Sequence, residues 1–183
     1  ETGGAEPAAA LVQAQAELLL DAGVVGGIPE LVAGHPRESG QLPEVGGAPI
    51  QPWSLASFLD ATMRGLVGAR YASADTLVIA PRLPEAWGET PVRLRLRGGT
   101  VGLTMTQTAD GLTATVEPGG DLTEAAALVL EASGRRVAVP LAVSSDTTVA
   151  AREAFTVELS ADGAEIDGEP APSGELAPPP DAW

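Results

Sequence analysis

The stretch that decides the fold is Val92-Arg93-Leu94-Arg95-Leu96-Arg97, in which aliphatic and charged residues alternate. A period of two is typical of a β-strand, because successive side chains point to opposite faces of a sheet. One face of this strand therefore points into a core, and the other face carries the arginines. Similar alternation recurs further along the chain, so a β-domain is predicted after about residue 70.

Further strands are predicted at short intervals after this one. Asp110-Gly111 is typical of a hairpin turn between two strands. The further strand candidates are Val101 to Met105, Leu112 to Val116, Ala127 to Glu131, Val137 to Leu141, Thr147 to Ala150 and Phe155 to Leu159. About seven or eight short strands with Gly, Ser and Asp turns predict an antiparallel β-sandwich. From about Gly168 the chain is acidic and rich in proline, and we expect no regular structure there.

Two amphipathic helices are predicted before residue 70. Pro7 to Asp21 and Trp53 to Val67 carry apolar residues at helical spacing, and Gly23 and Gly68 follow their ends. Two helices cannot bury their apolar stripes alone, so they either pack on the β-domain or belong to a larger helical domain. We favour the second alternative and expect a fragment. The predicted organisation is helices in 1–70, a β-sandwich-like domain in 71–167 and an acidic tail in 168–183.

The composition excludes several classes of function. Twenty-five acidic residues against ten basic ones give a net charge of −15, which disfavours nucleic acids and anionic membranes as partners. The absence of cysteine and the single His35 rule out disulfides, thiolate metal sites and paired-histidine zinc motifs, so no cofactor or metal is expected. No apolar run approaches the roughly 20 residues of a membrane span. We therefore expect a cytoplasmic protein, and attribute its acidity to genome composition or salt adaptation rather than to one partner.

Two segments carry the residues best suited to chemistry. Gly26-Gly27-Ile28-Pro29-Glu30-Leu31 holds a carboxylate in a turn shaped by glycine and proline, and Gln51-Pro52-Trp53-Ser54 opens the second helix with an amide and an indole. Such groups suit a sugar site, because an indole packs on C–H surfaces, an amide bonds hydroxyls and a carboxylate moves protons. Taken alone, the residues favour a solvated Glu30 and a core Trp53.

These two segments, in this order, resemble the end of glycogen debranching enzymes of the amylo-α-1,6-glucosidase type. In that family a Gly-x-Pro-Glu-Leu turn precedes a Gln-Ala-Trp-Ser element that opens the last helix of an (α/α)6 barrel. This chain has Gly27-Ile28-Pro29-Glu30-Leu31 and Gln51-Pro52-Trp53-Ser54, with Pro52 replacing alanine. Leu77 to Gly88 is similar to the family's exit into a β-domain. The resemblance covers roughly the first half of the chain.

The resemblance implies the C-terminal part of an inverting α-glucan hydrolase. Glu30 matches the general base that activates water, and Gln51 and Trp53 match positions that line the sugar pocket. The family's general acid, an Asp on an earlier barrel loop, has no counterpart in this sequence. The expected partners are an α-glucan or oligosaccharide and the missing N-terminal part of the same protein, and the chain alone is expected to be inactive.

The β-domain has its own alternatives. Arg93, Arg95 and Arg97 could contact a polysaccharide, although arginines balancing an acidic surface is the favoured interpretation. The later half of the domain has a single aromatic residue, Phe155, and lacks the platform typical of a starch-binding module. The remaining alternatives to the hydrolase are a non-catalytic carbohydrate-binding module and a structural β-domain of a multidomain protein.

Overall fold

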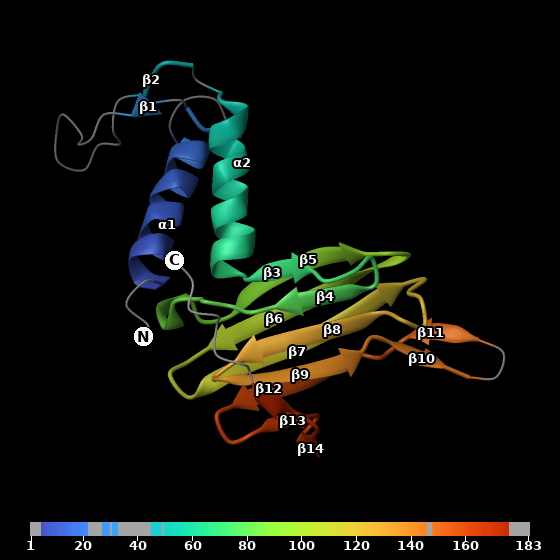
Figure 1. Cartoon of the computed structure of the whole chain (residues 1–183). Coiled ribbons are helices and arrows are strands. Elements are labelled where there is room, and N and C mark those ends of the chain that lie inside the picture. The colour runs from blue at the N-terminus through green and yellow to red at the C-terminus, as the bar shows by residue number, and fades with distance from the viewer. Residues whose placement is uncertain are drawn as a thin grey trace. The chain divides into compact units, whose positions relative to one another are not determined.

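The chain divides into two compact units, Glu1–Leu66 and Val67–Trp183. The structure, a computed structural model, describes residues 5–21, 27–29, 31–32, 45–48, 50–145 and 148–175. The described part of the first unit is mainly helical, and the second consists of β-sheets (Figure 1). No helix in these ranges is both long enough and apolar enough to cross a membrane.

Both predicted helices are confirmed in the first unit. They are α1 (Ala5–Asp21) and α2 (Pro52–Asp60), and α2 continues into the π-helical segment η1 (Ala61–Leu66). Proline at the first helical position of α2 fits the fixed backbone angle of that residue. Helix α1 buries Ala9, Val12 and Leu18, whereas Leu11 is 62% exposed. The short strands β1 (Leu31–Val32) and β2 (Val45–Gly46) pair with each other.

The second unit contains two larger sheets and a small ribbon (Figure 1). The six-stranded sheet has the order β14 (Glu169–Ala171), β13 (Ala164–Ile166), β12 (Phe155–Ser160), β7 (Gly111–Gly120), β6 (Gly99–Gln107) and β5 (Thr90–Leu96). The five-stranded sheet has the order β15 (Gly174–Glu175), β9 (Arg135–Pro140), β8 (Ala127–Ala132), β4 (Thr76–Ile79) and β3 (Ala69–Tyr71). The ribbon pairs β10 (Ala142–Ser144) with β11 (Val149–Ala151).

The two sheets form a β-sandwich-like domain with an aliphatic core. The predicted alternation is confirmed on β5, where Leu96 is buried while Arg93 and Arg95 are exposed. Strands β6, β7, β8 and β12 turn their alternate aliphatic residues to the same interior. The most deeply buried of these are Val101, Met105, Ala114, Val116, Leu128, Leu130 and Val157, each 0% exposed. Methyl-bearing side chains thus fill a core that contains few rings.

Two features of the sheets correct the sequence prediction. The sandwich is not wholly antiparallel, because β4 pairs with β8 in parallel, with Leu77 beside Leu128. Between β4 and β8 the chain forms three strands of the other sheet, β5 to β7. It then returns to the five-stranded sheet, where β8 runs in the same direction as β4. The segment after Gly168 is also not wholly irregular, since residues 169–171 and 174–175 form β14 and β15. Pro170 is tolerated there because β14 lies at a sheet edge.

The edges of the two sheets are joined by side chains on one side of the sandwich. The Tyr71 hydroxyl on β3 donates a hydrogen bond of 2.8 Å to the backbone carbonyl of Arg95 on β5. Asp75, in the turn after β3, accepts a hydrogen bond of 2.8 Å from the Thr123 hydroxyl and lies 3.6 Å from the Arg97 guanidinium. These contacts tie the edge strand β5 and the residue after it to the neighbouring sheet.

Candidate functional site

The two segments predicted to form a sugar site are brought together in the first unit. The backbone N–H of Gln51 donates a hydrogen bond of 2.8 Å to the carbonyl of Ile28. Gln51 is 7% exposed, and Gly27, Ile28 and Pro29 are also buried. A buried backbone hydrogen bond between residues 23 positions apart fixes the start of α2 against the Gly-Ile-Pro turn.

Gln51 also begins the helix. Its backbone is extended (φ −124°, ψ 111°), and its carbonyl accepts a hydrogen bond of 3.1 Å from the Leu55 N–H. The helix has no side-chain cap at this residue. Gln51 therefore begins the helix through its backbone carbonyl, and its side-chain amide makes no capping hydrogen bond.

Trp53, one residue inside α2, is 66% exposed. Trp53 therefore does not occupy the core position that the residue pattern taken alone favours. Ile50, two residues before the helix begins, is 50% exposed, so the start of α2 presents apolar surface. Trp53 and the buried turn at Ile28 both lie at the beginning of the same helix.

Glu30, the predicted catalytic residue, lies outside the described residues. Pro29 before it is buried, and Leu31 after it begins β1, which pairs with Gly46 on β2. The chain is thus described on both sides of this carboxylate, and the Gln51–Ile28 bond ties α2 to the backbone two positions before it. His35, the single histidine, also falls outside the described residues.

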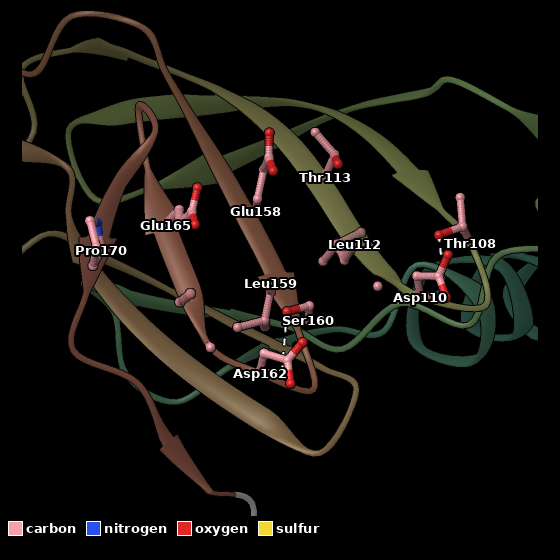
Figure 2. Close-up of a pocket in the computed structure, with 13 residues that line it drawn as sticks. Thr108, Asp110, Leu112, Thr113, Glu158, Leu159, Ser160, Asp162, Glu165 and Pro170 are labelled. Atoms are coloured by element: carbon pink, nitrogen blue, oxygen red, sulfur yellow. Dashed lines mark hydrogen bonds between the residues drawn. The ribbon is translucent and has the colours of Figure 1, made fainter.

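A second candidate is a recess of about 400 Å³ in the second unit, which the sequence prediction missed. It lies on the outer face of the six-stranded sheet, and Figure 2 shows Thr113, Glu158 and Glu165 projecting from neighbouring strands. Four carboxylates line it: Asp110, Glu158, Asp162 and Glu165. Three hydroxyl residues line it as well: Thr108, Thr113 and Ser160. None of its lining residues is aromatic or basic.

Two turns of nearly identical sequence border this recess. Thr108-Ala109-Asp110-Gly111 joins β6 to β7, and Ser160-Ala161-Asp162-Gly163 joins β12 to β13. In each turn the Asp N–H donates 3.3 Å to the hydroxyl two residues earlier, and the first N–H donates 2.9 Å to the glycine carbonyl. Gly111 pairs with Ser160, so the register places the turns side by side (Figure 2). The repeated tetrapeptide is the sequence signal that identifies them.

The recess does not have the composition of a catalytic sugar site. It has no ring on which a sugar could pack, and no basic group that would hold a carboxylate or a phosphate. No cluster of three metal-ligating side chains occurs among the residues that the structure describes. Its chemistry is that of a negatively charged, hydroxyl-lined surface.

One protein-family model matches part of the β-domain. A model of the family described as glycosyl hydrolase family 65, C-terminal domain, matches residues 71–125, from the end of β3 through β7 and into the turn before β8. No curated protein and no solved structure matches the chain. The matched stretch contains the alternating strand β5 and the β5–β6–β7 meander.

This match supports a C-terminal domain of the glycoside hydrolase type, associated with a glycosidase as the parent protein. The matched residues form strands and turns of the β-domain and include neither of the two predicted site segments. The match does not single out glycogen debranching enzymes. The first unit, with Glu30, Gln51 and Trp53, lies entirely before the matched residues.

Proposed function

We propose that this chain is the C-terminal part of an inverting α-glucan hydrolase of the glycogen-debranching, amylo-α-1,6-glucosidase type. In this proposal Glu30 is the general base, Gln51 and Trp53 line the sugar pocket, and α1 and α2 are helices of an (α/α)6 barrel. The second unit is the accompanying non-catalytic domain. An α-glucan in the cytoplasm is the substrate.

The observation that carries the proposal is the family match at residues 71–125, directly after the two site segments. A glycoside hydrolase C-terminal domain at this position makes the preceding helices the expected end of a catalytic domain. The hydrogen bond between Gln51 and Ile28 supports a shared site, because it joins the two segments that the resemblance places in one pocket. The exposed indole of Trp53 is free to meet a sugar.

The proposed chemistry follows from these groups. The Glu30 carboxylate takes a proton from a water molecule, which attacks the anomeric carbon on the face opposite the leaving group. The Trp53 ring packs on the C–H surface of the glucose unit and excludes bulk water from that face. The general acid belongs to an earlier loop of the barrel, so the 183-residue chain by itself is not expected to hydrolyse glycosides.

The second unit supports the barrel rather than binding glucan in this proposal. Its recess has four carboxylates and no aromatic platform, which suits contact with a cation better than stacking with a neutral sugar. The alternative, a carbohydrate-binding module, would need exposed rings. On this unit Tyr71 is 57% exposed, but its hydroxyl is bonded to the Arg95 carbonyl.

The stereochemistry of hydrolysis tests the function. Proton NMR of the full-length enzyme with a branched maltooligosaccharide should show β-glucose as the first product released from the α-linkage, because a single displacement inverts the anomeric carbon. The α-anomer should appear later, through mutarotation. Initial release of α-glucose would contradict the proposal, since retention requires a covalent intermediate on a second carboxylate.

A further inference from the structure

Strand β5 lies at one edge of the six-stranded sheet, and among the described residues it is the longest strand at an edge of either larger sheet. It has seven residues, whereas the edge strands β14 and β3 have three each and β15 has two. A long edge strand offers a row of unpaired backbone groups to which a strand of another chain can bind. The open side of β5 is therefore the place where self-association through a sheet would begin.

The strand register shows which backbone groups of β5 face its open side. Leu96 and Gly99 close the hairpin between β5 and β6 through a two-residue turn, so Leu96 is hydrogen-bonded to β6 and alternate residues point away from β6. The N–H and C=O groups of Arg93 and Arg95 therefore point to the open side. The hydrogen bond from the Tyr71 hydroxyl to the Arg95 carbonyl agrees with this assignment.

Both ends of this open row are closed to backbone pairing. At one end Pro91, which occupies the same row, has no N–H to donate. At the other end the Tyr71 hydroxyl already donates a hydrogen bond of 2.8 Å to the carbonyl of Arg95. An added strand therefore cannot bond every group along this edge, and it must displace Tyr71 to reach the Arg95 carbonyl.

The side chains of Arg93 and Arg95 add a charge barrier, since both are exposed on β5. If two copies paired antiparallel through β5 with Arg93 at the centre, Arg93 would stand against Arg93 of the other copy and Pro91 against Arg95. A pairing centred on Leu94 would set Arg93 against Arg95 twice. Like charges directly opposite each other destabilise a sheet, so both registers are disfavoured.

Glu117 on β7 offsets part of this charge. Arg93, Gly102 and Glu117 stand in one row across β5, β6 and β7. The Glu117 carboxylate lies over Gly102, where one oxygen is 3.2 Å from the position that a Cβ would take. The row of Arg95 continues through Thr100 to a glycine on β7, so no carboxylate stands beside Arg95 in its row. Arg95 is therefore the stronger of the two charges at the edge.

We propose that Pro91, Arg93, Arg95 and Tyr71 together prevent β5 from pairing with a second copy of the chain. Without them, two copies would join edge to edge across a two-fold axis, and their six-stranded sheets would become one continuous sheet. The role is independent of the proposed catalytic activity, because all four residues belong to the second unit.

Substitution of the edge residues in the full chain tests the proposal. Pro91→Thr, Arg93→Thr and Arg95→Thr together restore the missing N–H, remove both charges and introduce a residue of high β-propensity. By sedimentation velocity the native chain should be a monomer at about 100 μM, and the triple variant should associate at concentrations at least about tenfold lower. The variant has a net charge of −17 (−15 − 2), so general repulsion would oppose its association.

Arg82→Thr combined with Arg136→Thr is the matched control. It exchanges two exposed arginines for threonine and has the same net charge of −17 (−15 − 2), but neither position is at an open edge. Arg82 lies outside the strands, and Arg136 lies on β9, which has a strand on each side. This control should remain monomeric. The single variant Arg95→Thr, which changes the fold less, should associate in the same way as the triple variant but more weakly, and thermal unfolding checks that each variant is folded.

Amide hydrogen exchange of the native chain gives a second measurement that requires no variant. The N–H groups of Arg93 and Arg95 should exchange rapidly in dilute solution, whereas the N–H of Leu94, which faces β6, should exchange slowly. In the triple variant the amides at positions 93 and 95 should become protected as the protein concentration rises. The proposal is overturned if these two amides are protected in the dilute native chain. It is equally overturned if the folded edge variants associate no more than the matched control.

Discussion

Glu30→Gln in the full-length enzyme is expected to lower kcat by a factor of about 10² to 10⁴, the usual contribution of a general base. Glutamine keeps the size and hydrogen-bonding ability of the side chain but cannot accept the proton of the attacking water. Binding of the glucan should change little, so the loss should fall on kcat rather than on KM. Steady-state kinetics on a maltooligosaccharide, with circular dichroism as a check on folding, measure this effect.

Glu38→Gln is the control for this experiment. Glu38 lies on the same connection between the helices, eight residues after Glu30, and has no assigned role. Its substitution removes the same charge and should leave kcat within about twofold, since the proposed mechanism gives Glu38 no part in the reaction. Comparable losses in the two variants would show that the segment as a whole matters and that Glu30 is not the base.

Leu128→Ala is expected to reduce the free energy of unfolding of the second unit by about 3 kcal/mol. Leu128 on β8 is 0% exposed, and it pairs with Leu77 on β4 and Val139 on β9. Removing its branched methyl groups leaves a cavity between the sheets that surrounding aliphatic side chains fill only in part. Urea denaturation followed by circular dichroism measures the difference.

Val143→Ala provides the comparison for the core variant. Val143 on the ribbon strand β10 is 56% exposed, so its truncation should cost less than about 0.5 kcal/mol. If the two variants lost similar stability, Leu128 would not occupy the interior of a sandwich. The contrast tests the layer arrangement without requiring any enzymatic activity.

The β-domain was predictable where alternation is regular. On β5 the charged residues between Val92 and Leu96 mark the outer face, and the Asp110-Gly111 turn between β6 and β7 is found as predicted. The parallel pairing of β4 with β8 was not predictable in this way. Leu77, Val78 and Ile79 are all buried, so this short strand has no alternation from which its neighbour or direction could be inferred.

The acidic C-terminal segment shows that amino-acid composition alone does not determine whether a segment forms strands. Its proline and glutamate content favours disorder, yet Glu169 pairs with Ile166 and Gly174 with Arg136. Gly168 has a positive φ of 80°, which closes the tight turn between β13 and β14. Composition describes the average tendency of a segment, whereas a neighbouring unpaired edge strand can order it through backbone hydrogen bonds.

The candidate site was only partly predictable. The sequence placed Gln51 at the start of a helix, and the structure adds that its N–H binds the Ile28 carbonyl. That contact depends on the path of a loop of more than 20 residues, which no local pattern specifies. The acidic recess was missed because its residues come from four strands that are separated in sequence. The repeated turn sequence around Asp110 and Asp162 is the one local signal that could have indicated it.

Chemical rescue of a Glu30→Ala enzyme by azide tests the catalytic assignment most directly. Azide needs no general base, so it can attack the anomeric carbon in the space that the side chain vacates and form a glucosyl azide. We expect the variant to be nearly inactive alone and to regain turnover with added azide, yielding the β-glucosyl azide by inversion. Near-normal hydrolysis without azide, or formation of the α-glucosyl azide, would contradict the role of Glu30.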